Sequence, residues 1–202
     1  MINQELKEVL GELINISFGS ATAIIADLFD NFATLHVPDI TVIPINQIET
    51  MVMEGMDYGS VYITTQQFKG AFEGEIVFAI DSQSARNMQV LICEAEDFTA
   101  DDISDENEIQ QSILEIANIL GSSCIGKLAE LLESDVTFAP PAIEFTQQLL
   151  TGLDRTRYTR IIIISTVLEF QETQIFGKLF IMFNNEMYAW LEKSLEAFLE
   201  NM

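Results

Sequence analysis

Two short motifs with the same spacing carry the side chains that could do chemistry in this chain. Glu12 and Asn15 are three residues apart, and so are Glu115 and Asn118. A glutamate carboxylate can pair with a cation, and an asparagine amide both donates and accepts hydrogen bonds. These four residues are the candidate site, and what they can do depends on the elements that position them.

Other reactive side chains are sparse. His36 is the sole histidine, and no neighbouring residue suggests a nucleophile for it. Cys93 and Cys124 have no histidine or cysteine at metal-ligand spacing, so we expect both to be packing residues. The sequence has no glycine-rich phosphate-binding loop. We therefore expect no nucleotide or metal cofactor bound by the protein itself.

The two motifs belong to a longer internal repeat. They are separated by 103 positions (115 − 12), and so are the prolines that follow them, Pro38 and Pro141. Gly74 and Gly177 keep this offset (177 − 74), so we expect the register to run without a gap through helix, loop and strands. A register of this length indicates a duplicated unit and predicts a pseudo-two-fold axis.

Each repeat predicts a long helix, then strands, then a short helix. Apolar residues at three- and four-residue intervals predict amphipathic helices over about 4–31 and 105–133, the second beginning at an acidic box formed by Asp105 and Glu108. Strands are predicted at 41–45, 60–65 and 72–80 in the first repeat and at 143–145, 160–170 and 174–183 in the second. A short helix is predicted to end each repeat, at 82–93 and at 185–199. The predicted fold is α+β, with long amphipathic helices packed on an antiparallel β-sheet.

The repeats predict one domain. We expect a single domain over 1–202, built from repeats at about 4–93 and 105–199. An acidic linker, 94–108, joins them and holds eight acidic residues in fifteen positions. Like charges at this density keep a segment hydrated, so we expect no binding role for the linker.

On each long helix the Glu–Asn pair lies on a narrow polar stripe that faces away from the apolar residues, since a helix turns 100° per residue. The stripes contain Glu8, Glu12, Asn15 and Gly19 on the first helix, and Gln111, Glu115, Asn118 and Ser122 on the second. Any amphipathic helix has a polar face, but asparagine is a mediocre helix former, so its recurrence at one exposed place favours a function. The small residue that ends each stripe would let a partner's backbone approach closely.

The pattern resembles a known family. Glu-x-x-Asn followed after 22 residues by proline, present twice in a chain of this length, is similar to the CheC/CheX/FliY phosphatases of chemotaxis, and the two-copy layout is most like CheC. The resemblance implies that the protein hydrolyses the aspartyl-phosphate of a CheY-like response regulator. It implies that Asn15 and Asn118 position the attacking water, that Glu12 and Glu115 pair with the regulator, and that the Mg²⁺ belongs to the regulator.

Two observations keep alternatives open. The family pattern has Asp or Ser four residues before the glutamate, where this chain has Glu8 and Gln111, and the extra negative charge of Glu8 would weaken the first site. The FliM middle domain resembles the same fold without working Glu–Asn pairs, so a non-catalytic interaction module is the alternative. A third reading is an adaptor that binds a CheD-like deamidase, which the sequence does not separate from catalysis.

The composition of the chain excludes some classes of binding partner. Nine basic against 32 acidic residues give a formal net charge of −23, which repels nucleic acid and anionic lipid headgroups. The chain shows no secretory signal, and its unbroken apolar runs are far shorter than the roughly 20 residues of a membrane span. We therefore expect a cytoplasmic protein that binds neither nucleic acid nor membrane, and a monomer, since two repeats in one chain already supply the symmetry.

Overall fold

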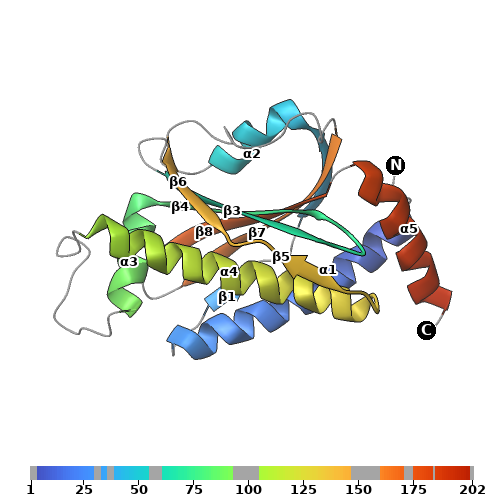
Figure 1. The fold of residues 1–202 in the computed structure, drawn as a ribbon, viewed down its shortest axis with the longest axis horizontal. Helices are drawn as coiled ribbons and strands as arrows, with labels where there is room; N and C mark the ends of the chain where they lie inside the picture. Colours follow the sequence, from blue (N-terminus) through green and yellow to red (C-terminus); the bar gives the residue numbers. More distant parts are fainter. Residues whose placement is uncertain are drawn as a thin grey trace.

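A computed structural model describes residues 4–29, 33–35, 39–54, 61–92, 105–146, 160–170, 175–183 and 185–200. The predictions made for His36, Cys93 and most of the acidic linker lie outside these residues. Within the part that is described, the predicted α+β class is confirmed. Long helices cover one face of an antiparallel sheet, as Figure 1 shows.

The sheet joins the two repeats by exchanging short strands between them. Its strands are β1 (Ala33–Leu35), β2 (Asp39–Pro44), β3 (Val61–Gly70), β4 (Gly74–Asp81), β5 (Val136–Phe138), β6 (Ala142–Thr146), β7 (Arg160–Phe170) and β8 (Ile175–Phe183). The hydrogen-bonded order is β1-β7-β8-β4-β3-β5, and β2 also pairs with β7 while β6 pairs with β3. The short strands of each repeat thus pair with the long strand of the other.

The pseudo-two-fold axis passes through the central pair of strands. β4 and β8 run antiparallel, and Val77 is paired with Phe180. These two residues are also equivalent in the repeat, because 180 − 77 = 103. A residue paired with its own equivalent marks the axis, so the predicted symmetry is confirmed at this point.

The gapless register predicted from the sequence is wrong for one strand in each repeat. Ile76 and Leu179 are equivalent (179 − 76 = 103), but their partners on the outer strands, Gln66 and Thr166, differ by 166 − 66 = 100. β7 is therefore shifted by three residues relative to β3, and the connection to β8 is longer by the same number. Compensating length changes on both sides of β7 hide this shift from a comparison of β4 with β8.

The helices lie in two sets on opposite faces of the sheet. One face carries α1 (Gln4–Phe29), α3 (Ser82–Ile92), α4 (Glu106–Leu131) and α5 (Asn185–Glu200), and the other carries η1 (Ile45–Gln47) and α2 (Ile48–Met53). In Figure 1 the colours of α1 and α4 run in opposite directions along neighbouring axes, so the two helices pack antiparallel. They are the pseudo-symmetric pair that the periodicity predicted.

The start of α4 corrects the predicted end of the linker. Asp105 is the N-cap, and its carboxylate accepts a hydrogen bond from the backbone N–H of Asn107 at 2.9 Å. Residues 106–108 are already helical. Their acidic side chains lie in the first turn, where negative charge interacts favourably with the helix dipole.

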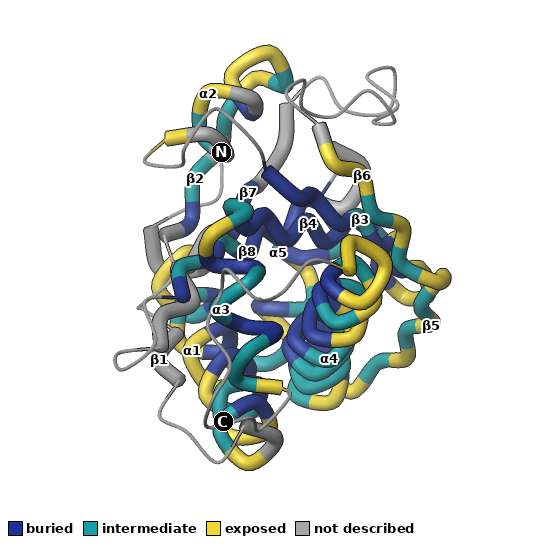
Figure 2. Tube along the Cα trace, turned by 90° about the vertical axis from the view of Figure 1, so that its left-hand side faces the viewer, coloured by how far each residue is buried: buried dark blue, intermediate teal, exposed yellow. Residues whose placement is uncertain are grey.

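Strand alternation divides the core into two clusters. Ile76, Phe78 and Ile80 of β4 face the long helices, and Val77 and Ala79 face the other side. All five are buried, so the centre of the sheet is covered on both faces. Figure 2 shows this centre in dark blue, with α4 dark blue on one side and teal or yellow on the other.

A lysine of the sheet forms hydrogen bonds with the end of α2 on the second face. Lys178 of β8 reaches the end of α2, where its Nζ donates to the carbonyl oxygens of Met51, at 3.5 Å, and Glu54. Burial lowers the pKa of Lys178, and the nearby carboxylate of Glu54 opposes this shift. The cation satisfies carbonyl groups that the helix itself leaves unpaired.

The apolar character of α1 comes from its place in the core. By length and composition alone, its segment Lys7–Asp27 could cross a membrane. Leu10, Leu13 and Ile14 are instead buried in the main core cluster, and α1 packs along α4. Core helices of soluble proteins pass the same length and composition test, so this observation is weak evidence for a span.

Candidate functional site

The four candidate residues lie on the two long antiparallel helices. Glu12 and Asn15 are on α1, Glu115 and Asn118 are on α4, and all four are exposed. Among the described residues, no hydrogen bond or ion pair joins either glutamate to its asparagine. The structure therefore offers two Glu–Asn pairs on the surface, one for each repeat.

Burial on the opposite side of each helix fixes the direction of the stripes. Leu13, Ile14 and Ser17 of α1 are buried, and so are Ile116 and Leu120 of α4. The hydroxyl of Ser17 donates to the Leu13 carbonyl oxygen at 2.7 Å, so this polar group is satisfied inside the core. Rotation of either helix about its axis would bury charge, so the core holds both pairs outward.

The ends of the two stripes are open to a partner. A Cβ on Gly19 would meet no atom within 4 Å. The hydroxyl of Ser122 lies against its own helix, where it donates to the Asn118 backbone carbonyl oxygen at 2.6 Å. Neither residue projects a long side chain, so another molecule could approach the helix backbone closely at both places.

A buried glutamine of the sheet supports the second pair. Nε2 of Gln66 donates to Oδ1 of Asn118 at 2.7 Å and to the Ala139 carbonyl oxygen at 3.0 Å. Gln66 is only 4% exposed, although Asn118 itself is exposed. Oε1 of Gln66 is buried and finds no hydrogen-bond partner among the described residues.

Gln66 was not among the residues predicted from the sequence, although its position on β3 carries a signal. Side chains two residues apart share one face of a strand. Tyr62, Thr64, Gln66 and Phe68 therefore share a face of β3, and all four are buried. An amide that alternates with buried aromatic residues points into the core, toward the helices.

A glycine lets α4 come close enough to the sheet for this contact. A Cβ on Gly121, one turn after Asn118, would lie 2.8 Å from Cδ1 of Ile76 and 3.3 Å from Oε1 of Gln66. Gly121 is buried, and a larger residue would force these side chains, or the helix itself, to shift. The short distance between α4 and β3 brings the Asn118 amide within reach of Gln66.

The first pair has different surroundings. The helix residue equivalent to Gly121 is Phe18 (121 − 18 = 103), which is buried, and the strand position equivalent to Gln66 holds Thr166. No group in the described part of the chain forms a hydrogen bond with the amide of Asn15. Ile16, beside this pair, is 49% exposed. The two Glu–Asn pairs therefore occupy equivalent backbone positions, but the side chains that surround them differ.

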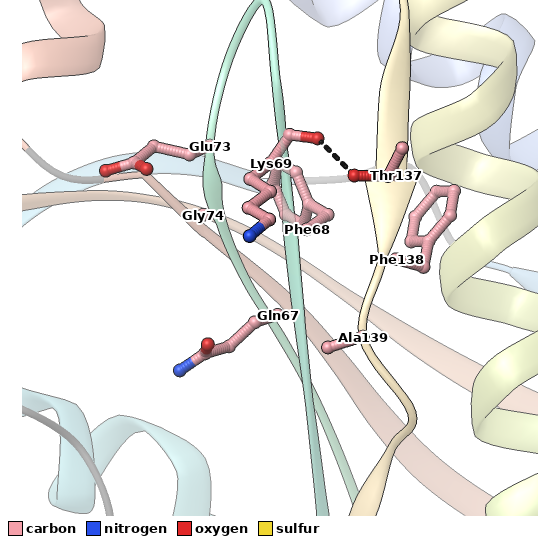
Figure 3. A pocket seen from close by; sticks show the side chains of 8 residues that line it. All are labelled: Gln67, Phe68, Lys69, Glu73, Gly74, Thr137, Phe138 and Ala139. Carbon is pink, nitrogen blue, oxygen red and sulfur yellow. Dashed lines mark hydrogen bonds between the residues drawn. The ribbon is translucent and has the colours of Figure 1, made fainter.

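A hollow of about 480 Å³ lies apart from the four residues, between β3, the turn after it and β5. Its lining, drawn in Figure 3, consists of Gln67, Phe68, Lys69, Glu73, Gly74, Thr137, Phe138 and Ala139. The Thr137 hydroxyl donates to the Lys69 carbonyl oxygen at 3.0 Å and joins β5 to β3. One lysine and one glutamate carry its charge, and none of the four candidate residues lines it.

Cys124, the cysteine that lies within the described residues, has a structural role. Cys124 of α4 is a free thiol and fully buried, and burial raises its pKa well above the usual range. A thiol held in its protonated form is a poor nucleophile. Cys124 is therefore the packing residue that the sequence predicted.

Solved structures of three kinds share this fold. Over 100% of both chains, the structure superposes on Thermotoga maritima FliY with a TM-score of 0.76 and 17% sequence identity. It matches a FliM middle domain from H. pylori with a TM-score of 0.64 and 9% identity, over 96% of this chain and 99% of that one. The third is the Borrelia burgdorferi CheX-CheY-BeF3-Mg complex, with a TM-score of 0.52 and 13% identity over 85% of this chain and 97% of that chain.

No protein-family model matches the sequence. At these levels of identity the structural likeness establishes the fold. The resemblance to the CheC/CheX/FliY group that the repeated motifs suggested is therefore confirmed at the level of the fold.

Proposed function

We propose that this protein is a phosphatase that hydrolyses the aspartyl-phosphate of a CheY-like response regulator in chemotaxis-type signalling. The observation that carries the proposal is the exposure of the same Glu–Asn pair at equivalent places on α1 and α4. The fold that presents these pairs is shared with CheX, which has been solved together with CheY, BeF3 and Mg²⁺. BeF3 takes the place of a phosphoryl group, so that complex holds CheX against a mimic of the phosphorylated regulator.

The chemistry required is modest and suits these residue types. An aspartyl-phosphate is a reactive acyl phosphate, so the main task is to place a water molecule in line with the leaving carboxylate oxygen. In this proposal Asn15 and Asn118 hold that water through their amides, and Glu12 and Glu115 pair with a cationic side chain of the regulator. The Mg²⁺ belongs to the regulator, and this protein has no cofactor of its own.

Exposed side chains on the two long helices fit this role. The phosphorylated aspartate of a regulator must be reached by an exposed side chain, and both pairs are exposed on α1 and α4, where the stripes end in the small residues Gly19 and Ser122. In the proposal the whole chain works in the cytoplasm as one monomeric domain made of the two repeats, about 4–93 and 105–199. A single molecule could then engage two regulators.

A second function is favoured by a different observation. The FliM middle domain matches this chain with a higher TM-score, 0.64, than the CheX of the CheY complex, 0.52. A non-catalytic interaction module is therefore the alternative, and an adaptor for a CheD-like deamidase is a variant of it. Both alternatives predict binding of a partner without any change in the lifetime of a phosphorylated regulator.

The decisive experiment follows loss of phosphate from phosphorylated response regulators, with the native chain, Asn15→Ala, Asn118→Ala and the double variant. Each single change should remove the share of the rate that belongs to one site, and the double change should remove all acceleration. Asn46→Ala serves as the control, because Asn46 is exposed on η1 at the other face of the sheet. Surface changes of this kind alter stability by no more than about 0.5 kcal/mol.

The outcomes separate the functions. A double variant that accelerates dephosphorylation as fast as the native chain would refute the assignment of the two asparagines. Binding of a regulator by the native chain without any acceleration would instead support the interaction module.

A further inference from the structure

We infer that Gln66 is a positioning residue which holds the Asn118 amide with its N–H groups toward the partner, so that the second Glu–Asn pair is prepared for catalysis and the first is not. This inference rests on the proposed phosphatase function and assigns unequal activity to its two sites. It starts from the contact between a buried amide of β3 and an exposed amide of α4.

A backbone carbonyl sets the orientation of both amides. The Ala139 carbonyl oxygen can only accept a hydrogen bond, so the group that faces it at 3.0 Å must be the NH₂ of Gln66. The second hydrogen of that NH₂ points to Asn118 at 2.7 Å and needs an acceptor there, which is Oδ1. The NH₂ of Asn118 is therefore turned away from Gln66, and no group among the described residues uses its two hydrogens, so they can serve a partner.

The orientation selects one way of holding water. An outward NH₂ donates to a lone pair of the attacking water and leaves the other lone pair free to point at phosphorus. A freely rotating amide would spend part of its time with its oxygen outward. That oxygen would then accept a hydrogen bond from the water, which is a different way of holding it. Fixing the amide before the regulator arrives removes this entropy cost from the reaction.

The burial of Gln66 is difficult to explain by stability alone. Its Oε1 is buried without a hydrogen-bond partner in the described part of the chain, which is unfavourable for a carbonyl group. A methionine has similar length and would fill the same space between α4 and β3 without an unpaired oxygen. The glutamine therefore leaves one buried carbonyl oxygen without a partner among the described residues while it orients a surface residue, as is common for residues that support a functional site.

The first repeat lacks both parts of this support. Thr166 occupies the position equivalent to Gln66, and threonine has a shorter side chain and no amide. Phe18 replaces Gly121, so a bulky ring stands where the other helix comes close to the sheet. Within the residues that the structure describes, the amide of Asn15 therefore has no counterpart of the hydrogen bond that fixes Asn118.

The test separates the two sites by combining Gln66→Met with changes that leave one site intact. In the Asn15→Ala background only the second site works, and Gln66→Met should lower kcat by about tenfold or more, because small errors of position are costly, while KM for the phosphorylated regulator changes little. In the Asn118→Ala background only the first site works, and Gln66→Met should change nothing. An unchanged kcat in the first background, or an equal loss in both, would overturn the inference.

A second measurement does not depend on activity. In ¹⁵N NMR spectra the side-chain amide of Asn118 should be more ordered than that of Asn15, and Gln66→Met should make the two equally mobile. If Asn118 keeps its order in the variant, Gln66 does not position it. If instead the order is lost but no form of the protein accelerates dephosphorylation, the contact is real and it is the proposed function that fails.

Discussion

Replacing Gly121 by alanine would measure how closely α4 must approach the sheet. The added Cβ would lie 2.8 Å from Cδ1 and 3.0 Å from Cγ2 of Ile76, which is buried on β4 between β3 and β8. Overpacking in such a place costs about 1–3 kcal/mol. Alanine is also the better helix former, by about 1 kcal/mol. The clash is the larger effect, so we expect Gly121→Ala to lower the free energy of unfolding by about 1 kcal/mol.

The same helix contains a matched control. A Cβ on Gly126 would meet no atom within 4 Å, so Gly126→Ala gains helix propensity without a clash. It should raise the free energy of unfolding by about 1 kcal/mol. The two variants make the same chemical change, and the expected difference between them, about 2 kcal/mol, isolates the packing of α4 against the sheet.

Urea unfolding, followed by circular dichroism, would show the difference as shifts of the midpoint in opposite directions with unchanged slopes. For a domain of this size, 1 kcal/mol also corresponds to about 2–4 °C in Tm. If Gly121→Ala were as stabilising as Gly126→Ala, α4 would have room to spare above Ile76. The close approach that brings Asn118 to Gln66 would then be refuted.

Two further predictions concern other contacts. Tyr62→Phe removes the 2.6 Å hydrogen bond from the Tyr62 hydroxyl to Glu106 and should cost about 1 kcal/mol at neutral pH, since the exposed carboxylate regains water. Burial and Glu106 raise the pKa of Tyr62 in the folded state, so its stabilisation is present below about pH 10 and is lost as the pH rises further. Urea midpoints measured at neutral and alkaline pH should show this loss of stability in the native chain and not in Tyr62→Phe. An equal loss at alkaline pH in the native chain and in Tyr62→Phe would contradict the prediction. Gly19→Ala should stabilise the fold by about 0.5–1 kcal/mol because the site is open, yet weaken binding of a phosphorylated regulator to the first site, measured as a higher KM for dephosphorylation in the Asn118→Ala background, where only the first site turns over. Unchanged binding there would show that no partner backbone comes close to Gly19.

The main elements were predictable because each has a strong periodic pattern. The predicted helices at about 4–31 and 105–133 correspond to α1 and α4, and the cap at Asp105 was visible as an acidic residue before the apolar stripe. The long strands were marked by runs of β-branched and aromatic residues. In contrast, β1 and β5 have three residues each, too few to show an alternation, and η1 and α2 lie in a segment without a clear period.

Long-range pairing could not be derived from local pattern. Nothing in the residues of β6 indicates that it pairs with β3 of the other repeat, since many partners would satisfy its alternation. The shift of β7 by three residues was not visible in the sequence, because the repeat offset is 103 both before β7, at the prolines, and after it, in β8. The support of Asn118 by Gln66 depends on both pairing and helix position, so the candidate pairs were visible in the sequence whereas their inequality was not.

The exchange of short strands between the repeats determines when the protein can fold during its synthesis. β2 is complete at Pro44, but its partner β7 begins at Arg160, which a ribosome working at about 5–20 residues per second reaches roughly 6–23 seconds later. For most of that interval β3 also lacks β6, which ends at Thr146, and β4 lacks β8 throughout, so the nascent first repeat exposes unpaired strand edges. The sheet can close only when nearly the whole chain has been made, and until then the edges of its early strands can pair with strands of neighbouring chains.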